Sequence, residues 1–378
     1  MMSAERAIHI VSFDVPFPPD YGGVIDVYYK IKALNDAGIR THLHCFAYGR
    51  QPKSELAKLC ASVNYYPRQT QKSLLFNTLP YIVLSRKSPE LKTRLLADEF
   101  PILMEGMHTT FLLPDPDLAS RTRVVRMHNI EHEYYEHLAQ AERNVFKRYY
   151  FYNESGKLKK YEPVLHHATA IAAISPAETA ELGKRFSSVR YIPVFHPFSE
   201  PETGPQTGDF ALYHGNLSVG ENNEAALFLV NEVFSKTKHK LVIAGSRPST
   251  DLVRAVKNYG NISIRSNLSP LEIHELIGQA RCNILPTFQS TGIKLKLLAA
   301  LYLGGKCLVN KPMVEGTALE SLCVVADSAE SMREELNRVM NQYLLNPEEI
   351  AERKKVLEME FSNTSGAKKL AALLFPEK

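Results

Sequence analysis

Residues Asn283 to Asn310, NILPTFQSTGIKLKLLAALYLGGKCLVN, contain the pattern that decides the fold. A short apolar run at 283–285 predicts a buried strand, and apolar residues at helical spacing after a polar loop predict a helix that ends at Gly304. Residues 307–310 predict a second strand. The unit is therefore strand, loop, helix, strand, which is typical of an α/β protein.

The loop of this unit precedes the amino terminus of the predicted helix, which makes it a candidate anion-binding site. First-turn N–H groups have no partner within a helix, and the helix dipole adds positive potential there. Lys294 and Lys296 place two ammonium groups beside the same loop. From these residues alone, an ordinary core helix with solvated lysines is the alternative.

The run Gly292 to Ala300, GIKLKLLAA, resembles the nucleotide-sugar loop and helix of family-four retaining glycosyltransferases of the GT-B fold. Their usual form is Gly-Thr-Arg-Leu-Lys-x-x-Glu-Ala, so the resemblance implies that Lys296 matches the family's lysine and Lys294 takes the place of its arginine. The chain departs from the family at Ala299, where members have a Glu that holds the donor ribose, and at Thr291, where its partner Glu would fall. The resemblance thus implies either another ribose contact or weak donor binding.

Length and composition favour a protein of two domains that does not bind nucleic acid. The 378 residues exceed what one core usually supports, and a hydrophobic content of 44% allows two cores. The net charge of +4 is a mild surplus, too small to indicate nucleic acid as a partner. No secretion signal and no long apolar stretch is evident, so we expect a cytoplasmic protein, and the five scattered cysteines fit reduced core thiols.

The first predicted strand, 8–13, runs into a proline-rich loop that ends in Gly22 and Gly23, and a helix follows near Val24. Glycines at such a junction let the backbone approach a phosphate closely. Proline-rich turns followed by two glycines are also common without this role. The segment resembles the first loop of the same family, which implies that Gly22 and Gly23 face the donor diphosphate and the acceptor.

Two segments combine basic and aromatic residues. Residues 50–94 contain nine Lys or Arg against two acids, with four aromatic residues among them. Such a surface could bind acidic lipid headgroups or a phosphorylated acceptor, and it could equally be a solvated face with its aromatic residues in the core. Residues 140–163 predict one long basic helix that includes Phe146 and Tyr149. We therefore keep an anionic membrane surface as a partner, with peripheral association on the cytoplasmic face.

Two predicted strands, 101–104 and 123–127, are each followed by a histidine, His108 and His128. The carboxyl ends of parallel strands form the edge where ligands bind. The tract that begins at Arg126, RMHNIEHEYYEHLA, resembles a segment of bacterial capsule and cell-wall members of the same family. The resemblance implies that His108 orients the transferred sugar, with His128 as the second choice.

A metal site is an alternative for the second tract, because His128 and His132 are four residues apart. The tract lacks a metalloprotease-type motif, and the carboxylates of Asp115 and Asp117 fit turn chemistry better, since prolines surround them. We therefore expect no metal and no cofactor, with the nucleotide-sugar acting as substrate.

The second half begins after a Pro- and Gly-rich segment, 201–208, that predicts a linker. A strand at 210–214 leads into Gly215 and Asn216, and a helix is predicted from about Ala225. Familiar family members have an Arg and a Lys in this loop, and both are missing here. The resemblance therefore implies that Lys294 and Lys296 supply most of the charge for the donor phosphates.

Glu315 follows a later strand, where family members keep a Glu-Gly pair. The resemblance implies that it could replace the missing ribose carboxylate. The same carboxylate could also be an ordinary solvated loop residue.

The predicted fold is α/β with GT-B architecture, two Rossmann-like domains that face each other across a cleft. We predict an amino-terminal acceptor domain over 1–200, a linker over 201–208, a nucleotide-sugar domain over 209–350 and a helical tail over 351–378 that packs back toward the first domain. The resemblance covers nearly the whole chain.

The resemblance implies a hexosyltransferase-like enzyme of polysaccharide biosynthesis. It would move a sugar from a nucleotide-sugar donor to a glycan or lipid-linked acceptor, with retention and without metal. Two alternatives remain open. One is a GT-B-fold nucleotide-sugar epimerase, which needs no acceptor. The other is a catalytically weak or inactive protein that binds glycans or nucleotides, which Ala299 and Thr291 make plausible.

Overall fold

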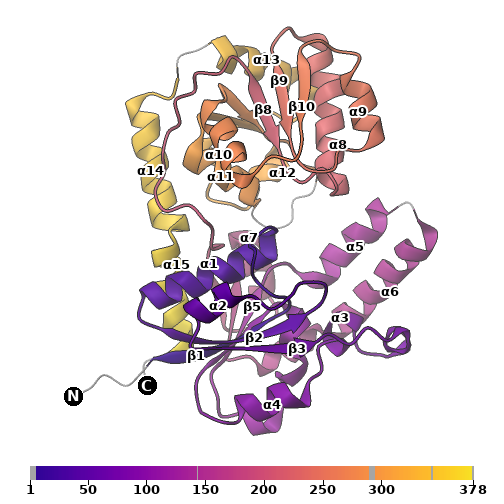
Figure 1. Ribbon diagram of the computed structural model, residues 1–378, viewed down its shortest axis with the longest axis vertical. Coiled ribbons are helices and arrows are strands. Elements are labelled where there is room, and N and C mark those ends of the chain that lie inside the picture. The colour runs from indigo at the N-terminus through magenta and orange to yellow at the C-terminus, as the bar shows by residue number, and fades with distance from the viewer. Residues whose placement is uncertain (1–5, 143, 289–293, 342–343, 377–378) are drawn as a thin grey trace. The chain divides into compact units, whose positions relative to one another are not determined.

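The computed structural model describes residues 6–142, 144–288, 294–341 and 344–376. The chain divides into two compact units, unit 1 with Met1–Pro197 and Phe361–Lys378, and unit 2 with Phe198–Glu360. Each unit contains one parallel β-sheet with helices packed against it (Figure 1).

Unit 1 has a seven-stranded parallel sheet in the order β3-β2-β1-β4-β5-β6-β7. Its strands are β1 (Ala7–Ser12), β2 (Arg40–Ala47), β3 (Ser62–Pro67), β4 (Ile102–Glu105), β5 (Arg123–Met127), β6 (Ala170–Ala173) and β7 (Val189–Tyr191). The strand order reverses between β1 and β4. At such a point the connecting loops diverge and leave a ligand-binding crevice at the carboxyl ends of the strands.

Alternation along the strands of unit 1 supplies two apolar cores, one on each face of the sheet. Leu103 and Val124 join one core, whereas their neighbours Met104 and Val125 join the other. Helices α1 (Gly22–Asp36) and α15 (Asn363–Leu374) contribute to the first core, and α4 (Pro89–Leu95) and α7 (Pro176–Gly183) to the second. Figure 1 shows α1 and α4 on opposite sides of the sheet.

The remaining α-helices of unit 1 are α2 (Ser54–Leu59), α3 (Tyr81–Leu84), α5 (Glu131–Ala141) and α6 (Val145–Tyr161). The prediction of one long helix over 140–163 is wrong. The side chain of Asn144 accepts hydrogen bonds from the N–H groups of Phe146 and Lys147, which caps a new helix at this point. The helix predicted near Val24 is present, but it begins two residues earlier than predicted, because Gly22 and Gly23 form the first turn of α1.

Unit 2 has a six-stranded parallel sheet in the order β10-β9-β8-β11-β12-β13. Its strands are β8 (Ala211–His214), β9 (Leu241–Ala244), β10 (Ile262–Arg265), β11 (Cys282–Ile284), β12 (Lys306–Val309) and β13 (Val324–Val325). The order reverses between β8 and β11, so this sheet repeats the arrangement of unit 1.

The α-helices among the described residues of unit 2 are α8 (Gly220–Phe228), α9 (Thr250–Val256), α10 (Pro270–Gln279), α11 (Leu295–Leu303), α12 (Lys311–Val314), α13 (Ala329–Asn341) and α14 (Pro347–Phe361). Helix α8 begins at Gly220, five residues before the predicted start. A capping box formed by Ser269 and Glu272 starts α10.

Each segment that joins the two units forms contacts with one of them. The N–H groups of Gln206 and Gly208 donate to the carbonyl oxygens of Gly278 and Gln279, so segment 201–208 lies along unit 2. After α14, Ser362 accepts a hydrogen bond from the N–H of Ser365 and caps α15. The apolar side of α15 then joins the core of unit 1.

Candidate functional site

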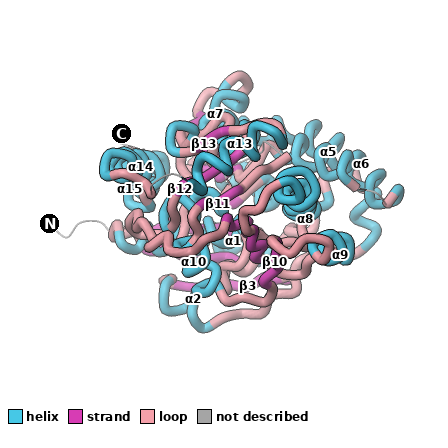
Figure 2. The backbone as a smooth tube through the Cα atoms, turned by 90° about the horizontal axis from the view of Figure 1, so that it is seen from above, coloured by secondary structure: helices cyan, strands magenta, loops and turns pink. Residues whose placement is uncertain are grey.

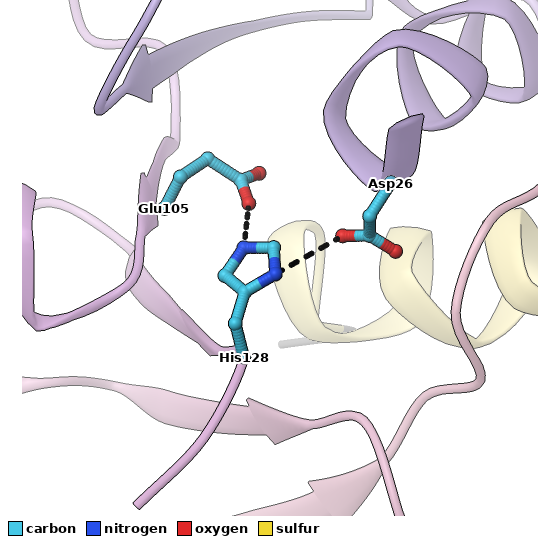
Figure 3. A group of neighbouring side chains, drawn as sticks. All are labelled: Asp26, Glu105 and His128. Carbon is cyan, nitrogen blue, oxygen red and sulfur yellow. Dashed lines mark hydrogen bonds and ion pairs between the residues drawn. The ribbon is translucent and has the colours of Figure 1, made fainter. Parts of the chain in front are cut away.

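At the carboxyl end of β4, Glu105 lies beside His128, which follows β5 (Figure 3). The Nε2 atom of His128 is 2.9 Å from Oε2 of Glu105, and its Nδ1 atom is 3.9 Å from Oδ2 of Asp26 on α1. Glu105 and Asp26 are fully buried, whereas the side chain of His128 is 13% exposed. One nitrogen of His128 is therefore oriented by a buried carboxylate, as in sites where a histidine transfers or shares a proton.

Two buried cations balance these carboxylates. The Nζ atom of Lys30 lies 2.6 Å from Glu105 and 2.8 Å from Asp26, and Arg126 donates to both oxygens of Asp26. Burial alone would raise the pKa of both carboxyls. Lys30 and His128 nevertheless hold the pKa of Glu105 below its usual value, and Arg126 and Lys30 hold that of Asp26 well below. Both carboxylates are charged at neutral pH.

This charge balance tests whether the group could be a metal site. Asp26, Glu105 and His128 each offer a ligand atom, all within 4.8 Å of one another. Lys30 and Arg126 already occupy the carboxylate oxygens and neutralise their charge. A divalent cation would have to displace these buried cations, so the trio does not fit a metal site.

His132 does not converge with His128 on a common point. Its Nδ1 atom is 3.3 Å from Oε1 of Glu162, whereas His128 faces Glu105. The spacing of four residues therefore does not make a metal site.

His108 lies in a 3-10 turn, Met107–Leu112, after β4. Its Nδ1 atom is 3.7 Å from Oε1 of Glu131, at the start of α5. Burial and the nearby Arg86 lower the pKa of His108 well below its usual value, and burial raises the pKa of Glu131 to about 8. At neutral pH this is a neutral imidazole beside a protonated carboxyl, a pair suited to hydrogen-bonding sugar hydroxyls.

The ring of Phe13 joins the two histidines. Its centroid is 5.4 Å from that of His108 and 5.5 Å from that of His128. A Cβ atom at Gly23 would lie only 2.6 Å from the tip of this ring. Gly23 thus allows Phe13 to pack in the first turn of α1. Gly22 is exposed at the start of that turn.

In unit 2, Lys296 lies in the first turn of α11 and reaches toward β8 and α8. Its Nζ atom donates to Oδ1 of Asn222 at 2.9 Å and to the hydroxyl of Tyr213 at 3.4 Å. Burial is the main cause that lowers the pKa of Lys296, to about 8, and Lys294 lowers it further against the opposing effect of Glu221. Lys296 is thus a desolvated ammonium held by uncharged groups.

Lys294 is the N-cap residue of α11 and differs from Lys296 in its partner. Its Nζ atom is 3.3 Å from Oε1 of Glu221, which also accepts a hydrogen bond from Thr287. The charge of Lys294 is therefore largely compensated, and Lys296 is the better candidate for an anionic ligand.

Other candidate residues follow β8. Gly215 comes directly after this strand, and the backbone oxygen of the next residue, Asn216, accepts a hydrogen bond from Asn222. The side chain of Asn216 accepts hydrogen bonds from Ser218 and Ser246. Lys296, Asn222 and Asn216 thus form one bonded group.

His214, the last residue of β8, is buried, and among the described residues its Nε2 atom has no hydrogen-bond partner. Burial and the nearby Lys296 lower its pKa to about 3, so the ring is neutral at neutral pH.

The structure gives less information about the other residues that were predicted to bind the donor. Glu315 is exposed and follows α12, which itself follows β12. Thr291 and Gly292 lie outside the described residues. Ala299 is 8% exposed in α11, and its methyl group offers no hydrogen bond to a ribose.

Several solved structures share this two-sheet architecture over nearly the full length. TarM superposes with a TM-score of 0.68 at 10% identity, covering 99% of each chain. WaaG, a glycosyltransferase involved in lipopolysaccharide biosynthesis, gives 0.63 at 14% identity, covering 98% of this chain and 100% of WaaG. A trehalose-6-phosphate synthase, studied for glycosyl transfer with retention, gives 0.60 at 10% identity, covering 98% of each. The chain has the GT-B fold.

Sequence comparison adds one bacterial relative. An uncharacterized 44.6 kDa protein in the cps region of Klebsiella pneumoniae is 27% identical over 314 residues, which cover 78% of this chain and 80% of the relative. No family model matches the chain. The GT-B assignment therefore depends on the architecture.

Within the GT-B fold, the candidate residues gather at the point where the order of each sheet reverses. In unit 1 they follow β1, β4 and β5, and in unit 2 they follow β8 or begin α11, except Glu315, which follows α12. Sequence reasoning missed a set of polar residues, six of them buried and two partly buried. The buried ones are Asp26, Lys30, Glu105, Arg126, Glu131 and His214, and the partly buried ones are Glu221 and Asn222. Glu105 carried a usable signal, because it is the single charge in the otherwise apolar strand β4.

Proposed function

We propose that this GT-B protein is a glycosyltransferase that moves a sugar from a nucleotide-sugar donor to a glycan or lipid-linked acceptor, with retention and without a metal ion. The full-length likeness to GT-B structures, several of which are named as glycosyltransferases, is the observation that carries this proposal. The Klebsiella relative's cps region supports a role in bacterial polysaccharide biosynthesis.

Unit 2 would bind the donor through its diphosphate. When the sugar–phosphate bond breaks, negative charge develops on the departing nucleotide diphosphate, and fixed positive groups stabilise that charge more than the ground state. The ammonium of Lys296 and the amino terminus of α11 supply positive potential at one place. Lys294 would also bind the diphosphate, once the diphosphate has displaced the carboxylate of Glu221 from its ammonium.

Unit 1 would contact the sugar and the acceptor. His128 presents one nitrogen held by Glu105, and its ring is partly accessible. His108 presents a neutral ring beside the protonated Glu131. We assign His108 and His128 to orientation of the transferred sugar and the acceptor hydroxyl. This role fits the neutral ring of His108 and the hydrogen bond that holds the ring of His128 against Glu105.

A catalytically weak or inactive binding protein is the second candidate, and Ala299 is the observation that favours it. The family carboxylate that holds the ribose is a methyl group in this chain. Exposed Glu315 is then the available carboxylate for the ribose hydroxyls.

A thermal-shift screen against UDP-, GDP- and dTDP-sugars, followed by a product assay with and without acceptor, tests the proposal. A transferase is stabilised by one nucleotide class, because a ligand that binds only the folded state raises the melting temperature, and it turns over with acceptor in the presence of EDTA. Turnover without acceptor would indicate an epimerase. Stabilisation without turnover would indicate a binding protein, and loss of turnover in EDTA would contradict metal independence.

A further inference from the structure

Helices α5 and α6 form a hairpin that projects from unit 1, and they lie side by side in both views (Figures 1 and 2). The base of the hairpin is well packed. Leu158 of α6 joins a small apolar cluster with Ile82 and Val83 of α3, and the N–H of Tyr81 donates to buried Glu154 at 2.6 Å. The base therefore fixes the direction in which the rest of α6 points.

The first two turns of α6 expose large apolar and aromatic side chains. The exposed fractions are 63% for Val145, 87% for Phe146, 74% for Tyr149 and 47% for Tyr152. This is a cluster and not a scatter of single residues, and exposed clusters of this kind usually mark an interaction surface.

The exposed charges on the same helix have one sign. Lys147, Arg148, Lys159 and Lys160 are exposed, whereas the single acid of α6, Glu154, is fully buried and paired with Lys157 at 2.9 Å. Exposed α6 is therefore positive along its length, so its partner should be negatively charged.

Helical geometry places the aromatic and basic groups together. Phe146, Tyr149 and Lys160 are spaced by three and eleven residues, so they share the face of α6 opposite buried Leu158. Two acids with accessible side chains, Glu133 at 44% exposed and Glu136, lie on the neighbouring helix, α5. The positive aromatic face is thus that of α6.

A fourth exposed aromatic residue belongs to the same region. Phe76 is 90% exposed in the 3-10 turn Lys72–Phe76, and the carbonyl of its neighbour Leu75 accepts a hydrogen bond from Lys157 of α6 at 2.7 Å. By contrast, Tyr66 of the basic segment 50–94 is 1% exposed and lies in the core. Of these aromatic residues in 50–94, Phe76 is therefore the one that extends the surface of α6.

We infer that α6, together with Phe76, docks on an anionic lipid bilayer. Aromatic rings favour the boundary between headgroups and acyl chains, while lysine and arginine side chains reach the lipid phosphates. A folded protein partner would need an acidic apolar groove, whereas a bilayer supplies negative charge and an apolar layer over any shape. The inference concerns binding alone and does not depend on the proposed activity.

Flotation of the full chain with vesicles tests the inference. We expect binding to vesicles of phosphatidylglycerol mixed with phosphatidylcholine, weakening with salt, and little binding to phosphatidylcholine alone. The double variant Phe146→Ser/Tyr149→Ser should weaken partitioning by on the order of tenfold or more. Each reversal in Lys159→Glu and Lys160→Glu should weaken it by at least about fivefold, since a basic residue near an anionic surface contributes about 1 kcal/mol.

Leu271→Ser is the matched control, because Leu271 is 67% exposed on unit 2 and acidic Glu272 follows it. It should leave flotation unchanged, and all variants should keep the melting temperature and nucleotide response of the parent chain. Equal binding to both vesicle types, or full binding by the double variant, would overturn the inference. Sedimentation that shows a dimer abolished by the double variant, without vesicle binding, would assign the face to self-association instead.

Discussion

The Nε2–H group of His128 donates to Oε2 of Glu105 over 2.9 Å, while the other oxygen of the same carboxylate accepts from the ammonium of Lys30 at 2.6 Å. Glu105 therefore holds a partly exposed histidine and a fully buried lysine at once. The orientation of His128 and the stability of unit 1 depend on the same carboxylate.

Replacing Glu105 should show both roles. Glu105→Gln keeps the shape but removes the charge that balances Lys30, and breaking a buried pair costs about 3 kcal/mol or more. We expect that loss in the free energy of unfolding by urea, together with a fall in kcat and a shifted pH profile. Glu136→Gln, at an exposed position of α5, should leave the stability, kcat and pH profile unchanged. Lower stability with an unchanged kcat and pH profile would leave Glu105 a purely structural residue.

Replacing Lys296 should reduce turnover strongly. If its ammonium stabilises charge on the leaving diphosphate, Lys296→Ala should lower kcat by on the order of 10²- to 10³-fold. Lys294→Ala should cost less, because Glu221 already compensates that lysine. Exposed Lys236→Ala on the same unit is the control. A Lys296→Ala enzyme with near-normal kcat would refute this role.

The pKa of Lys296, lowered to about 8, also predicts a pH effect on ligand binding. Above that pH the free protein loses the ammonium, so affinity for a nucleoside diphosphate should fall as pH rises past 8 in calorimetric titrations. The dependence should weaken in Lys296→Arg, because a guanidinium remains charged. An affinity that is flat across this range in the parent chain would contradict the assignment.

Glu315→Ala should raise the donor KM several-fold and leave kcat nearly unchanged if this carboxylate binds the ribose in place of the family's missing pair. Steady-state kinetics at saturating acceptor measure this effect. Glu232→Ala, at an exposed position elsewhere on unit 2, should leave the donor KM and kcat unchanged. If Glu315→Ala binds the donor as tightly as the parent chain in calorimetry, Glu315 does not bind the ribose.

The buried histidines of unit 1 predict acid sensitivity. His44 lies between Nδ1 of His9 at 2.9 Å and the hydroxyl of Tyr66 at 2.8 Å, and burial lowers its pKa from 6.5 to about 3. The unfolded chain therefore binds more protons than the folded one between these values. Stability should be full above pH 6.5 and fall as the pH drops toward 3, by up to about 1.4 kcal/mol per pH unit for this group.

Urea unfolding across this pH range checks the prediction. His44→Gln should flatten the acid slope, although it lowers stability at neutral pH. His167→Gln, at an exposed position, should leave the slope as it is. An acid slope that persists in His44→Gln would show that other groups cause it.

Local sequence patterns were sufficient to predict many of the strands and helices. Six strands predicted from the sequence lie within one residue of β1, β4, β5, β8, β11 and β12, because apolar runs and alternation depend on neighbours in sequence. The break at Asn144 was missed, since helix propensity changes little there and the cap competes with a continuous helix by only about 1 kcal/mol.

The sequence by itself determined two parallel α/β units, the lysines at the start of α11 and two histidines after adjacent strands. Only the tertiary structure decided which buried charges meet: Arg126 pairs with Asp26 across 100 residues, and Glu105 with Lys30 across 75. Periodicity shows that such a residue faces a core, but the identity of its partner depends on strand order and helix placement. A buried charge is stable only where that placement brings the opposite charge to it.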